Sequence, residues 1–430
     1  MTTYGTKQEP GITTEITSSA AVPTSGEAPS NPGYVGQADL ENANDAADTG
    51  KVYQVTRASK AVDWFGPMES SLLTNAVVDA LNEGAYPVYA VATPEETVSG
   101  EDHSGAATTT VSTDKVPIRE DALTTDVTLD GTDLDVNIVR DEVDSYSPES
   151  GECYLNPVRG QIEIPSTPGS DLTVGYDTFD YQSAIDVMAD NVADTIDFLF
   201  PLSENSDVVD MANLTVGNLE DQYDLVLCVG GADINIPDVT AFEQQYDDSR
   251  TQVVYPTRFE DGTSAVAAVV GQKAQLGLGS TPINRRLDTN KSLDKTLNKA
   301  ERGTLNDAGV VPLANEPRGV RVTDDPTTVS ESNTDEANLN YGFNRLVADY
   351  IIETTRDNEK PFIGKLNSQT VRNTLQSMID EQLSGLQESD VVISYDVNVL
   401  KEDAVTVGLE MKVDLVEPLR FIDNTVTITN

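Results

Sequence analysis

The chain has 430 residues, with 73 acidic and 27 basic side chains and a formal net charge of −46. This length is enough for several domains, and a field of this sign repels nucleic acid, which is bound mainly through its phosphates, as well as anionic membranes. Because molar salt would screen the self-repulsion, the composition favours a halophilic source. Ordered apolar patterns along the chain argue against a disordered acidic polymer.

No apolar run approaches the roughly 18 residues needed to span a bilayer. The first residues lack the basic and apolar regions of a signal peptide. We therefore expect a soluble protein that is made in the cytoplasm and has no membrane insertion. The two cysteines, Cys153 and Cys228, are far apart in sequence, so a disulfide is possible but is not implied.

The N-terminal segment carries a short alternating pattern within polar sequence. Ile12, Thr14 and Ile16 fall on one side, which predicts a strand outside any compact unit. Globular sequence begins near residue 32. It continues into a segment with helical spacing that ends at Gly84.

Ser, Thr and Gly dominate residues 94–112, which we expect to form a polar linker. Several strand-like runs separated by turn residues follow, up to about residue 180, with no helix pattern among them. This order predicts a small all-β domain inserted between two α/β stretches. Residues 323–338 are polar and acidic, which is typical of a solvated loop.

The last hundred residues have the clearest patterns. Two amphipathic helices are predicted, and Ser368 or Thr370 could cap the second one. A hairpin follows, in which alternating apolar residues define one face of each strand. That face would cover the two helices, and its members are Val391, Ile393, Tyr395, Val407, Leu409 and Met411.

The final residues alternate once more. Ile422, Val426 and Ile428 follow Phe421 on one face, and threonines occupy the other. Such a half-buried strand needs a partner sheet. Two hairpin strands leave two open edges, and an open edge is a template for another chain. The terminal strands could also fold back onto their own subunit.

Candidate catalytic, metal and nucleotide motifs are weak. His103, the only histidine, lies in the expected linker, so we interpret it as solvated; it makes neither a catalytic triad nor a zinc site. A strand precedes Gly230, but GxGxxG and GxxxxGK[ST] are absent. Arg285 and Arg286 could hold an anion, although pairing with nearby carboxylates is the better interpretation.

One acidic run resembles the start of a calcium loop. It contains Asp133, Asp135 and Asn137, but Ile138 occupies the position that needs glycine, and no glutamate closes the loop. Solvated strand carboxylates explain the run equally well. We therefore predict no enzyme activity, no catalytic residue, no metal site and no cofactor.

The order of segments resembles the contractile tail sheath proteins. The N-terminal stretch GYVGQADL…KVYQVTRASKAVDWFGPMESSLLTNAVVDALNEGAYPVYAVA has Gly33, Gly36, Phe65-Gly66 and Glu83-Gly84 at the places expected in that family. The helix VRNTLQSMIDEQLSGL, the SYDVNV strand and the final LRFIDNTVTIT strand also match in order. Two elements depart from the pattern: the "nGG" signature reads Gly84-Ala85, and the "aPAn" element is at best STPIN.

The resemblance implies an α+β and α/β multidomain fold, with a sheath-like core, an inserted all-β domain and strand arms at both ends. The implied division begins with an N-terminal arm (1–22), the first part of the core (23–95) and the inserted outer β domain (96–180). An α/β middle domain (181–335), a C-terminal sheath domain (336–418) and a C-terminal donor-strand arm (419–430) follow.

In that family, the arms of two neighbours complete the C-terminal sheet of each subunit. The resemblance therefore implies hexameric rings stacked around an inner tail tube, with the tube, baseplate and tail terminator proteins as partners and the virion tail as location. A non-viral contractile injection system is equally compatible with the sequence. We expect some of four bases in the C-terminal domain to meet an acidic tube, with ordinary pairing to nearby Asp and Glu side chains as the alternative: Arg345, Lys360, Lys365 and Arg372.

Two other classes of protein make different predictions. A halophilic α/β enzyme would need a phosphate loop or a clustered site of histidine, cysteine and serine, and neither pattern is found. A surface-layer protein would need a signal peptide. The sheath interpretation depends on no single motif, since it rests on the ordered set of segments and the two arms.

Overall fold

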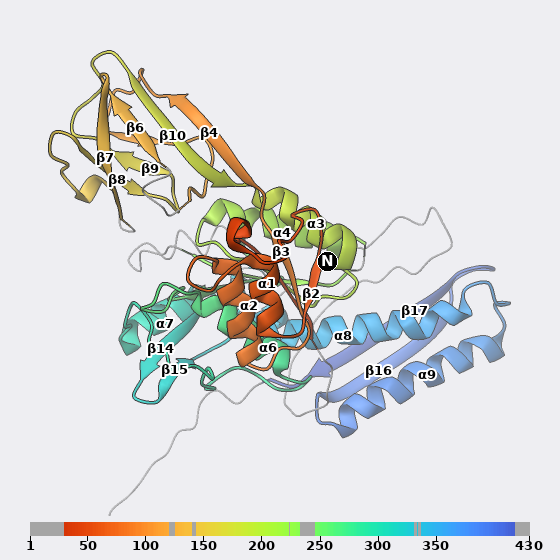
Figure 1. Ribbon diagram of the computed structural model, residues 1–430. Coiled ribbons are helices and arrows are strands. Elements are labelled where there is room, and N and C mark those ends of the chain that lie inside the picture. Colours follow the sequence, from red (N-terminus) through yellow and green to blue (C-terminus); the bar gives the residue numbers. More distant parts are fainter. Residues whose placement is uncertain are drawn as a thin grey trace, which may run out of the picture.

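The computed structural model describes residues 30–119, 125–139, 143–222, 224–232, 246–330, 333 and 337–417. These residues form an α/β body, a β unit that projects from it, and a C-terminal unit of helices and a hairpin (Figure 1). Short 3-10 helices also occur: η1 (Leu40–Asn42), η3 (Val143–Ser145), η5 (Ala337–Leu339) and η6 (Lys360–Phe362).

The body is built on an eight-stranded sheet with the order β15-β14-β13-β12-β11-β1-β3-β2. The six strands from β14 to β3 are parallel, and β15 and β2 close the two edges in antiparallel pairing. Its strands are β1 (Pro32–Gly36), β2 (Tyr53–Val55), β3 (Val88–Ala92), β11 (Phe198–Pro201), β12 (Leu227–Gly231), β13 (Thr251–Tyr255), β14 (Val310–Glu316) and β15 (Gly319–Val322).

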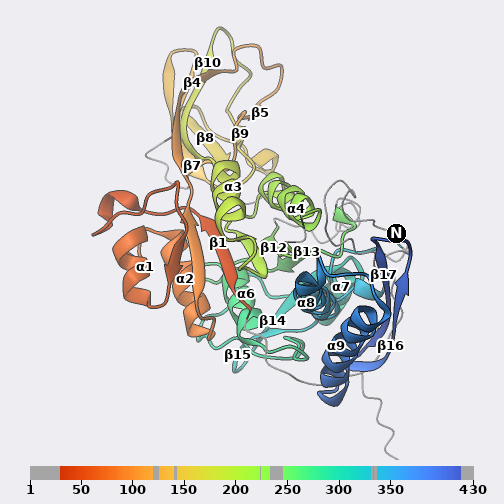
Figure 2. The ribbon, with the colours of Figure 1, turned by 90° about the vertical axis from the view of Figure 1, so that its right-hand side faces the viewer.

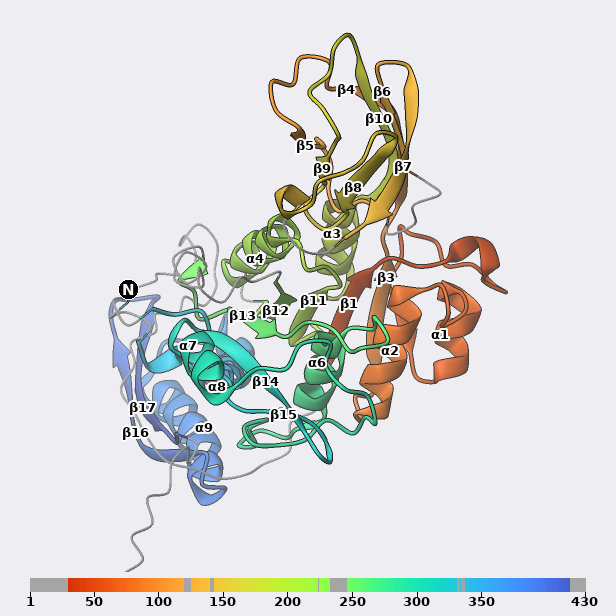
Figure 3. The same cartoon turned by 90° about the vertical axis from the view of Figure 1, so that its left-hand side faces the viewer.

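Helices cover both faces of this sheet, as expected for parallel strands that are apolar throughout. Figures 2 and 3 show the two layers from opposite sides. One layer contains α1 (Ala58–Phe65), α2 (Leu72–Asn82) and α6 (Ala265–Gln275), which share a buried core. The other contains α3 (Tyr181–Val192), α4 (Ser206–Glu220) and α7 (Lys299–Asp307).

Glycines in the body allow close packing of helices. A Cβ atom at Gly230 in β12 would lie 2.8 Å from Val209 of α4, so this glycine brings the helix close to the strand. In α6, a Cβ atom at Gly271 would lie 2.6 Å from the Cα atom of Ala80 in α2. The glycine pair at the end of β12, Gly230 and Gly231, therefore has a packing role.

The β unit is a seven-stranded sheet with the order β4-β10-β6-β7-β8-β9-β5 and a core of its own. It leaves the body after β3 and returns at α3, at the top of Figure 1. Its strands are β4 (Glu95–Asp102), β5 (Thr110–Ser112), β6 (Asp126–Leu129), β7 (Thr132–Ile138), β8 (Glu152–Asn156), β9 (Gln161–Glu163) and β10 (Leu172–Phe179).

The linker predicted over residues 94–112 is wrong, because β4 and β5 occupy most of it. β4 pairs with β10 along nearly its whole length. Its residues are mostly exposed on both faces, so its sequence lacks the apolar alternation that identifies a strand. Backbone pairing with β10 stabilises it instead.

The C-terminal unit consists of α8 (Gly342–Glu359), α9 (Gln369–Glu388), β16 (Val392–Lys401) and β17 (Val407–Leu415). Ser368 caps α9 by accepting a hydrogen bond from the N–H of Val371, which decides between the two predicted caps. The apolar faces of both helices and of the hairpin form one core. This agrees with the predicted packing of the hairpin on the helices.

Buried charges join the C-terminal unit to the body. Arg250, just before β13, makes a two-pronged ion pair with Asp349 of α8, with N–O distances of 2.9 and 3.0 Å. Arg250 also pairs with Glu220 at the end of α4 at 2.7 Å. Arg345 donates to Asp349 at 3.1 Å. The junction therefore depends on a compact ion cluster in which Arg250, Arg345 and Asp349 are buried and Glu220 is partly exposed.

The solvated loop predicted over residues 323–338 is also partly wrong. Asp325, Thr327 and Thr328 are each at most 1% exposed. The N–H of Thr328 donates to the carbonyl of Thr251, and Asp325 pairs with Lys273 of α6 at 2.5 Å. These three side chains are buried with partners from other segments: Lys273 for Asp325, the carbonyl of Leu339 for Thr327 and the carbonyl of Asp248 for Thr328.

Candidate functional site

The C-terminal hairpin is the feature best suited to bind a strand from another chain. β16 and β17 form a two-stranded antiparallel sheet, and no other described strand pairs with either of them. The outer edges of these strands, ten and nine residues long, therefore have no described strand beside them. In β16, the carbonyl oxygens of Ile393 and Val397 accept hydrogen bonds from the side chains of Gln387 and Gln376 of α9. An isolated two-stranded sheet is at best marginally stable, and here α9 supports only one face.

A β-bulge sets which side chains face the helices. The pairing steps from Val392↔Leu415 to Ser394↔Asp414, so Ile393 is an extra residue in β16. Val391 and Val392 are consequently both buried, whereas Ile393 is 42% exposed. The prediction that Ile393 faces the helices is therefore wrong, because a bulge reverses the alternation at that point.

The rest of the predicted hairpin face lies where the pattern indicated. Tyr395 packs against the core, and its hydroxyl donates to the carbonyl of Asp380 in α9 at 3.2 Å. Val407, Leu409 and Met411 of β17 are partly buried against the same core. The hairpin is thereby held by one face, while neither edge pairs with another strand among the described residues.

The predicted donor strands lie outside the described residues. These are Ile12, Thr14 and Ile16 near the N-terminus and Phe421, Ile422, Val426 and Ile428 near the C-terminus. Their pairing stays a prediction.

The four predicted tube-facing bases lie in different environments. Arg345 is 1% exposed and belongs to the buried ion cluster with Asp349, so its predicted role at a surface is wrong. The sequence shows its helical position but cannot show that α8 turns this face toward the body.

Lys360, Lys365 and Arg372 belong to the segment that runs from the end of α8 to the first turn of α9. Lys360 forms an exposed ion pair with Asp357 at 2.8 Å. The Lys365 ammonium lies 4.3 Å from the ring centre of Phe362. Arg372, in the first turn of α9, donates to the side-chain oxygen atoms of Asn367 and Gln369. These three bases keep the surface position that a contact with a partner requires.

The single histidine has a specific environment. His103 follows directly on β4, and its Nε2 lies 2.7 Å from the carboxylate of Glu101, with only 15% of the side chain exposed. Tyr176 donates to the same carboxylate at 2.5 Å. The predicted solvated linker histidine is therefore wrong, and the group belongs to a structural cluster of the β unit.

The two cysteines are free and buried in separate units. Burial raises the pKa of the Cys153 thiol to about 12 and also raises the pKa of Cys228. Asp133, Asp135 and Asn137 lie along β7. Within the part of the chain that the structure describes, no cluster of three or more His, Cys, Asp or Glu side chains has the geometry to hold a metal ion.

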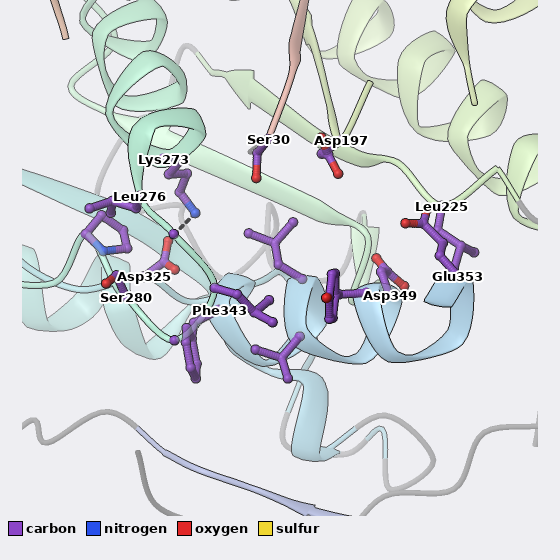
Figure 4. A pocket seen from close by; sticks show the side chains of 17 residues that line it. Ser30, Asp197, Leu225, Lys273, Leu276, Ser280, Asp325, Phe343, Asp349 and Glu353 are labelled. Atoms are coloured by element: carbon purple, nitrogen blue, oxygen red, sulfur yellow. Dashed lines mark ion pairs between the residues drawn. The ribbon is translucent and has the colours of Figure 1, made fainter. Parts of the chain in front are cut away.

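A cavity lies between α8 and the adjacent parts of the body (Figure 4). Its polar wall includes Asp197, Lys273 and Asp325, and apolar residues of α8 such as Phe343 form another wall. The Lys273–Asp325 pair is oriented toward its partners in the body. The charged groups of this wall therefore pair within the junction between α8 and the body.

Arg286 and Gly230 also have structural partners. Arg286 pairs with Glu316 at 2.9 Å, which supports the predicted salt bridge. The close packing of Gly230 on α4 explains the glycine without a bound nucleotide. Among the described residues, no helix combines the length and the apolar character that crossing a membrane requires.

Comparison with known proteins places the fold. No protein-family model matches the chain, and no curated protein sequence matches it. Solved structures do match. The contracted helical sheath of the anti-feeding prophage is 14% identical, with 98% of this chain and 99% of that chain covered and a TM-score of 0.60.

Two bacterial sheath tail proteins are similar as well. The one from Listeria innocua is 13% identical, with coverages of 92% and 94% and a TM-score of 0.58. The one from Desulfitobacterium hafniense is 15% identical, with coverages of 94% and 100% and a TM-score of 0.55. The chain therefore has the fold of contractile sheath proteins over nearly its whole length, which confirms the resemblance at the level of the fold.

Proposed function

We propose that the chain is the subunit of a contractile sheath. Copies would stack as six-membered rings in a helical tube around an inner tail tube, and shortening of the lattice would drive that tube through a host envelope. The observation that carries the proposal is a supported hairpin with two open edges, on a fold that resembles sheath proteins from end to end.

The hairpin is the acceptor in this proposal. Residues 1–22 of one neighbour and residues 419–430 of another would add a strand to each edge, in the manner of β-strand addition. Each net backbone hydrogen bond contributes about 0.5–1.5 kcal/mol. A strand with five such bonds thus contributes several kcal/mol before the cost of ordering, and the link recurs at every subunit.

The function is mechanical and requires no enzyme activity. Energy would be stored in contacts between subunits, while the arms keep neighbours linked as near-rigid bodies move. The β unit would face outward, and the C-terminal unit would face the tube. Baseplate and tail terminator proteins would bound the polymer, assembled in the host cytoplasm, in a virion tail or in a related injection system.

Three surface bases would contribute to the tube-facing side. Lys360, Lys365 and Arg372 lie around one loop of the C-terminal unit, whereas Arg345 is excluded by its burial. Surface ion pairs contribute at most about 1 kcal/mol each, and salt weakens them further. These bases would orient the contact more than they strengthen it.

Electron microscopy of the purified protein in molar salt tests the proposal. The full-length chain is compared with a chain that ends at Val416, and both are mixed with inner tubes as a template. We expect tubes of uniform width from the full-length chain, and monomers or single rings from the shortened one.

Two results would contradict the proposal at different levels. If the full-length chain forms no polymer even on inner tubes, the sheath function is wrong. If the shortened chain forms the same tubes, the last residues do not link subunits, and the donated C-terminal strand must be abandoned. A chain lacking residues 1–22 tests the other arm in the same way.

A further inference from the structure

The cavity of Figure 4 lies where α8 crosses the amino-terminal ends of the body strands. Its lining includes Ser30, two residues before β1, Asp197, directly before β11, and Leu225, two residues before β12. Arg250, which holds α8 through Asp349, directly precedes β13. Open α/β sheets bind their ligands at the carboxyl ends of the strands instead. The cavity is therefore a space between α8 and the body rather than the usual ligand crevice of such a sheet.

Four partly exposed apolar side chains form one side of this cavity. Leu346 and Tyr350 come from α8, and Leu276 and Leu278 come from the loop that follows α6. Leu278 and Tyr350 pack against the core of the C-terminal unit, and Leu346 packs against the core of the body. The cavity thus presents apolar surface that a further segment of chain can bury.

The polypeptide enters the body at the wall of this cavity. Ser30 is the first residue that the structure describes, and Asn31 is held firmly beside it. The N–H of Asn31 donates to the Asp197 carboxylate at 2.7 Å, and its side-chain amide donates to the carbonyl of Thr195 at 2.9 Å. Because these bonds fix the position of Ser30, the residues that precede it must start from the cavity.

The 29 residues before Ser30 include a stretch whose composition suits an apolar surface. Among residues 16–29, Glu27 is the only charged residue, whereas 23% of the whole chain is charged. The same stretch contains the apolar run Ala20–Pro23. It is therefore better suited to burial than the acidic sequence that is typical of this chain.

The stretch is also long enough to follow α8. Pro23 and Pro29 favour an extended backbone at their own positions and at the residues before them. An extended segment of this kind rises by about 3.1 Å per residue, so residues 22–29 would span about 25 Å. The part of α8 that lines the cavity, from Phe343 to Glu353, is about 15 Å long. Residue 22 can therefore reach any part of the cavity from Ser30.

We propose that residues 22–29 pack in the cavity of their own chain, with Val22 and Pro23 against Leu278 and Leu346. The segment covers the partly exposed apolar side chains and continues directly into Ser30. Because the contact is apolar, molar salt does not screen it. The inference concerns a single chain and does not rest on the proposed function, so its failure would leave that function in place.

Such packing gives the N-terminal arm a fixed origin. Residues before 22 leave the subunit beside α8, next to the ion cluster at Asp349 that joins the C-terminal unit to the body. In the proposed sheath, a force on the arm would therefore act on this junction before it reaches β1.

Disulfide cross-linking of the full-length chain in 2 M salt tests the inference. A chain with Val22→Cys and Leu278→Cys is oxidised at a protein concentration too low for polymerisation. A chain with Val22→Cys and Leu214→Cys is the control, because Leu214 is 70% exposed on α4 of the body. The two original cysteines are buried and stay unreactive. We expect the first chain to form its intramolecular disulfide at least tenfold faster than the control.

Each other outcome overturns the inference. Equal rates in the two chains would mean that the segment does not occupy the cavity. Covalent dimers linked from position 22 of one chain to position 278 of another, identified by electrophoresis and peptide mapping, would mean that a second copy supplies the segment. Adding Leu346→Asp to the first chain should remove its rate advantage, and an unchanged rate would show that apolar packing does not hold the segment.

Discussion

Replacing Asp349 by alanine should loosen the C-terminal unit from the body. Asp349 accepts two hydrogen bonds from Arg250 and at least one from Arg345, and both arginine residues are only 1% exposed. The variant leaves Arg345 without its carboxylate and Arg250 with Glu220 alone. Breaking a buried pair from one side typically costs about 3–5 kcal/mol.

Hydrogen exchange of the α8 amides measures this effect directly. Since about 1.36 kcal/mol corresponds to a factor of ten, we expect exchange by opening of α8 to accelerate about 10²- to 10⁴-fold. Asp357→Ala is the control on the same helix, because its pair with Lys360 has both side chains about two-thirds exposed. That exposed pair should contribute at most about 1 kcal/mol. If α8 exchange accelerates less than tenfold in both variants, burial of the ion pair does not determine the stability of this junction.

Acid should weaken the same junction. Burial opposes ionisation of Asp349, but the charges of Arg250 and Arg345 outweigh it and hold the pKa below the ordinary 3.8. A carboxylate whose pKa is lowered by folding contributes stability above its unfolded pKa, and this contribution is lost as the pH falls through the folded one. Faster α8 exchange below about pH 4 in the original protein, absent from Asp349→Ala, is the expected signature.

Further variants test other parts of the body. Gly271→Ala should destabilise by about 1–3 kcal/mol through overpacking against α2, whereas Gly217→Ala in α4, with open space around it, should be neutral or stabilising by up to about 1 kcal/mol in denaturant unfolding. Burial raises the pKa of Glu83 to about 7, so the folded state disfavours the charged carboxylate, and the free energy of unfolding falls as the pH rises from about 4.5 to 7. Glu83→Gln should therefore stabilise the protein by about 1–3 kcal/mol at pH 8 and little at pH 4. Cys153 and Cys228 should resist thiol reagents until the protein unfolds, since both are buried with raised pKa values.

Sequence patterns predicted the elements whose stability comes from one apolar face. The α9 helix and the β17 strand both show their periodicity plainly, and both occur. Ile393 shows the limit of such patterns, because a bulge adds one residue and reverses the alternation without any local signal. β4 shows another limit, since its exposed residues are held by pairing with β10 rather than by burial.

Buried polar residues were the least predictable. Arg345 looks like a surface base on an amphipathic helix, and Asp325 looks like part of a solvated acidic loop. Arg345 pairs with Asp349 one turn further along its own helix, and both are buried because Arg250 and Ser249 of the body contact them. Asp325 is buried because Lys273 of α6 pairs with it. A pattern within one element does not contain such long-range pairings, so only the tertiary structure places these residues.

The distribution of forces suits the proposed sheath subunit, which would have to move without coming apart. Exposed ion pairs are screened in molar salt, so they are poor candidates for holding either a domain junction or a lattice. At the junction, the charges that matter are buried around Asp349, where salt has little access. At the hairpin, the open edges offer backbone hydrogen bonds, whose strength depends little on net charge. If copies are linked through those edges, the links should persist at the molar salt concentration at which acidic surfaces can approach one another. Contraction would then rearrange the lattice while each subunit stays folded.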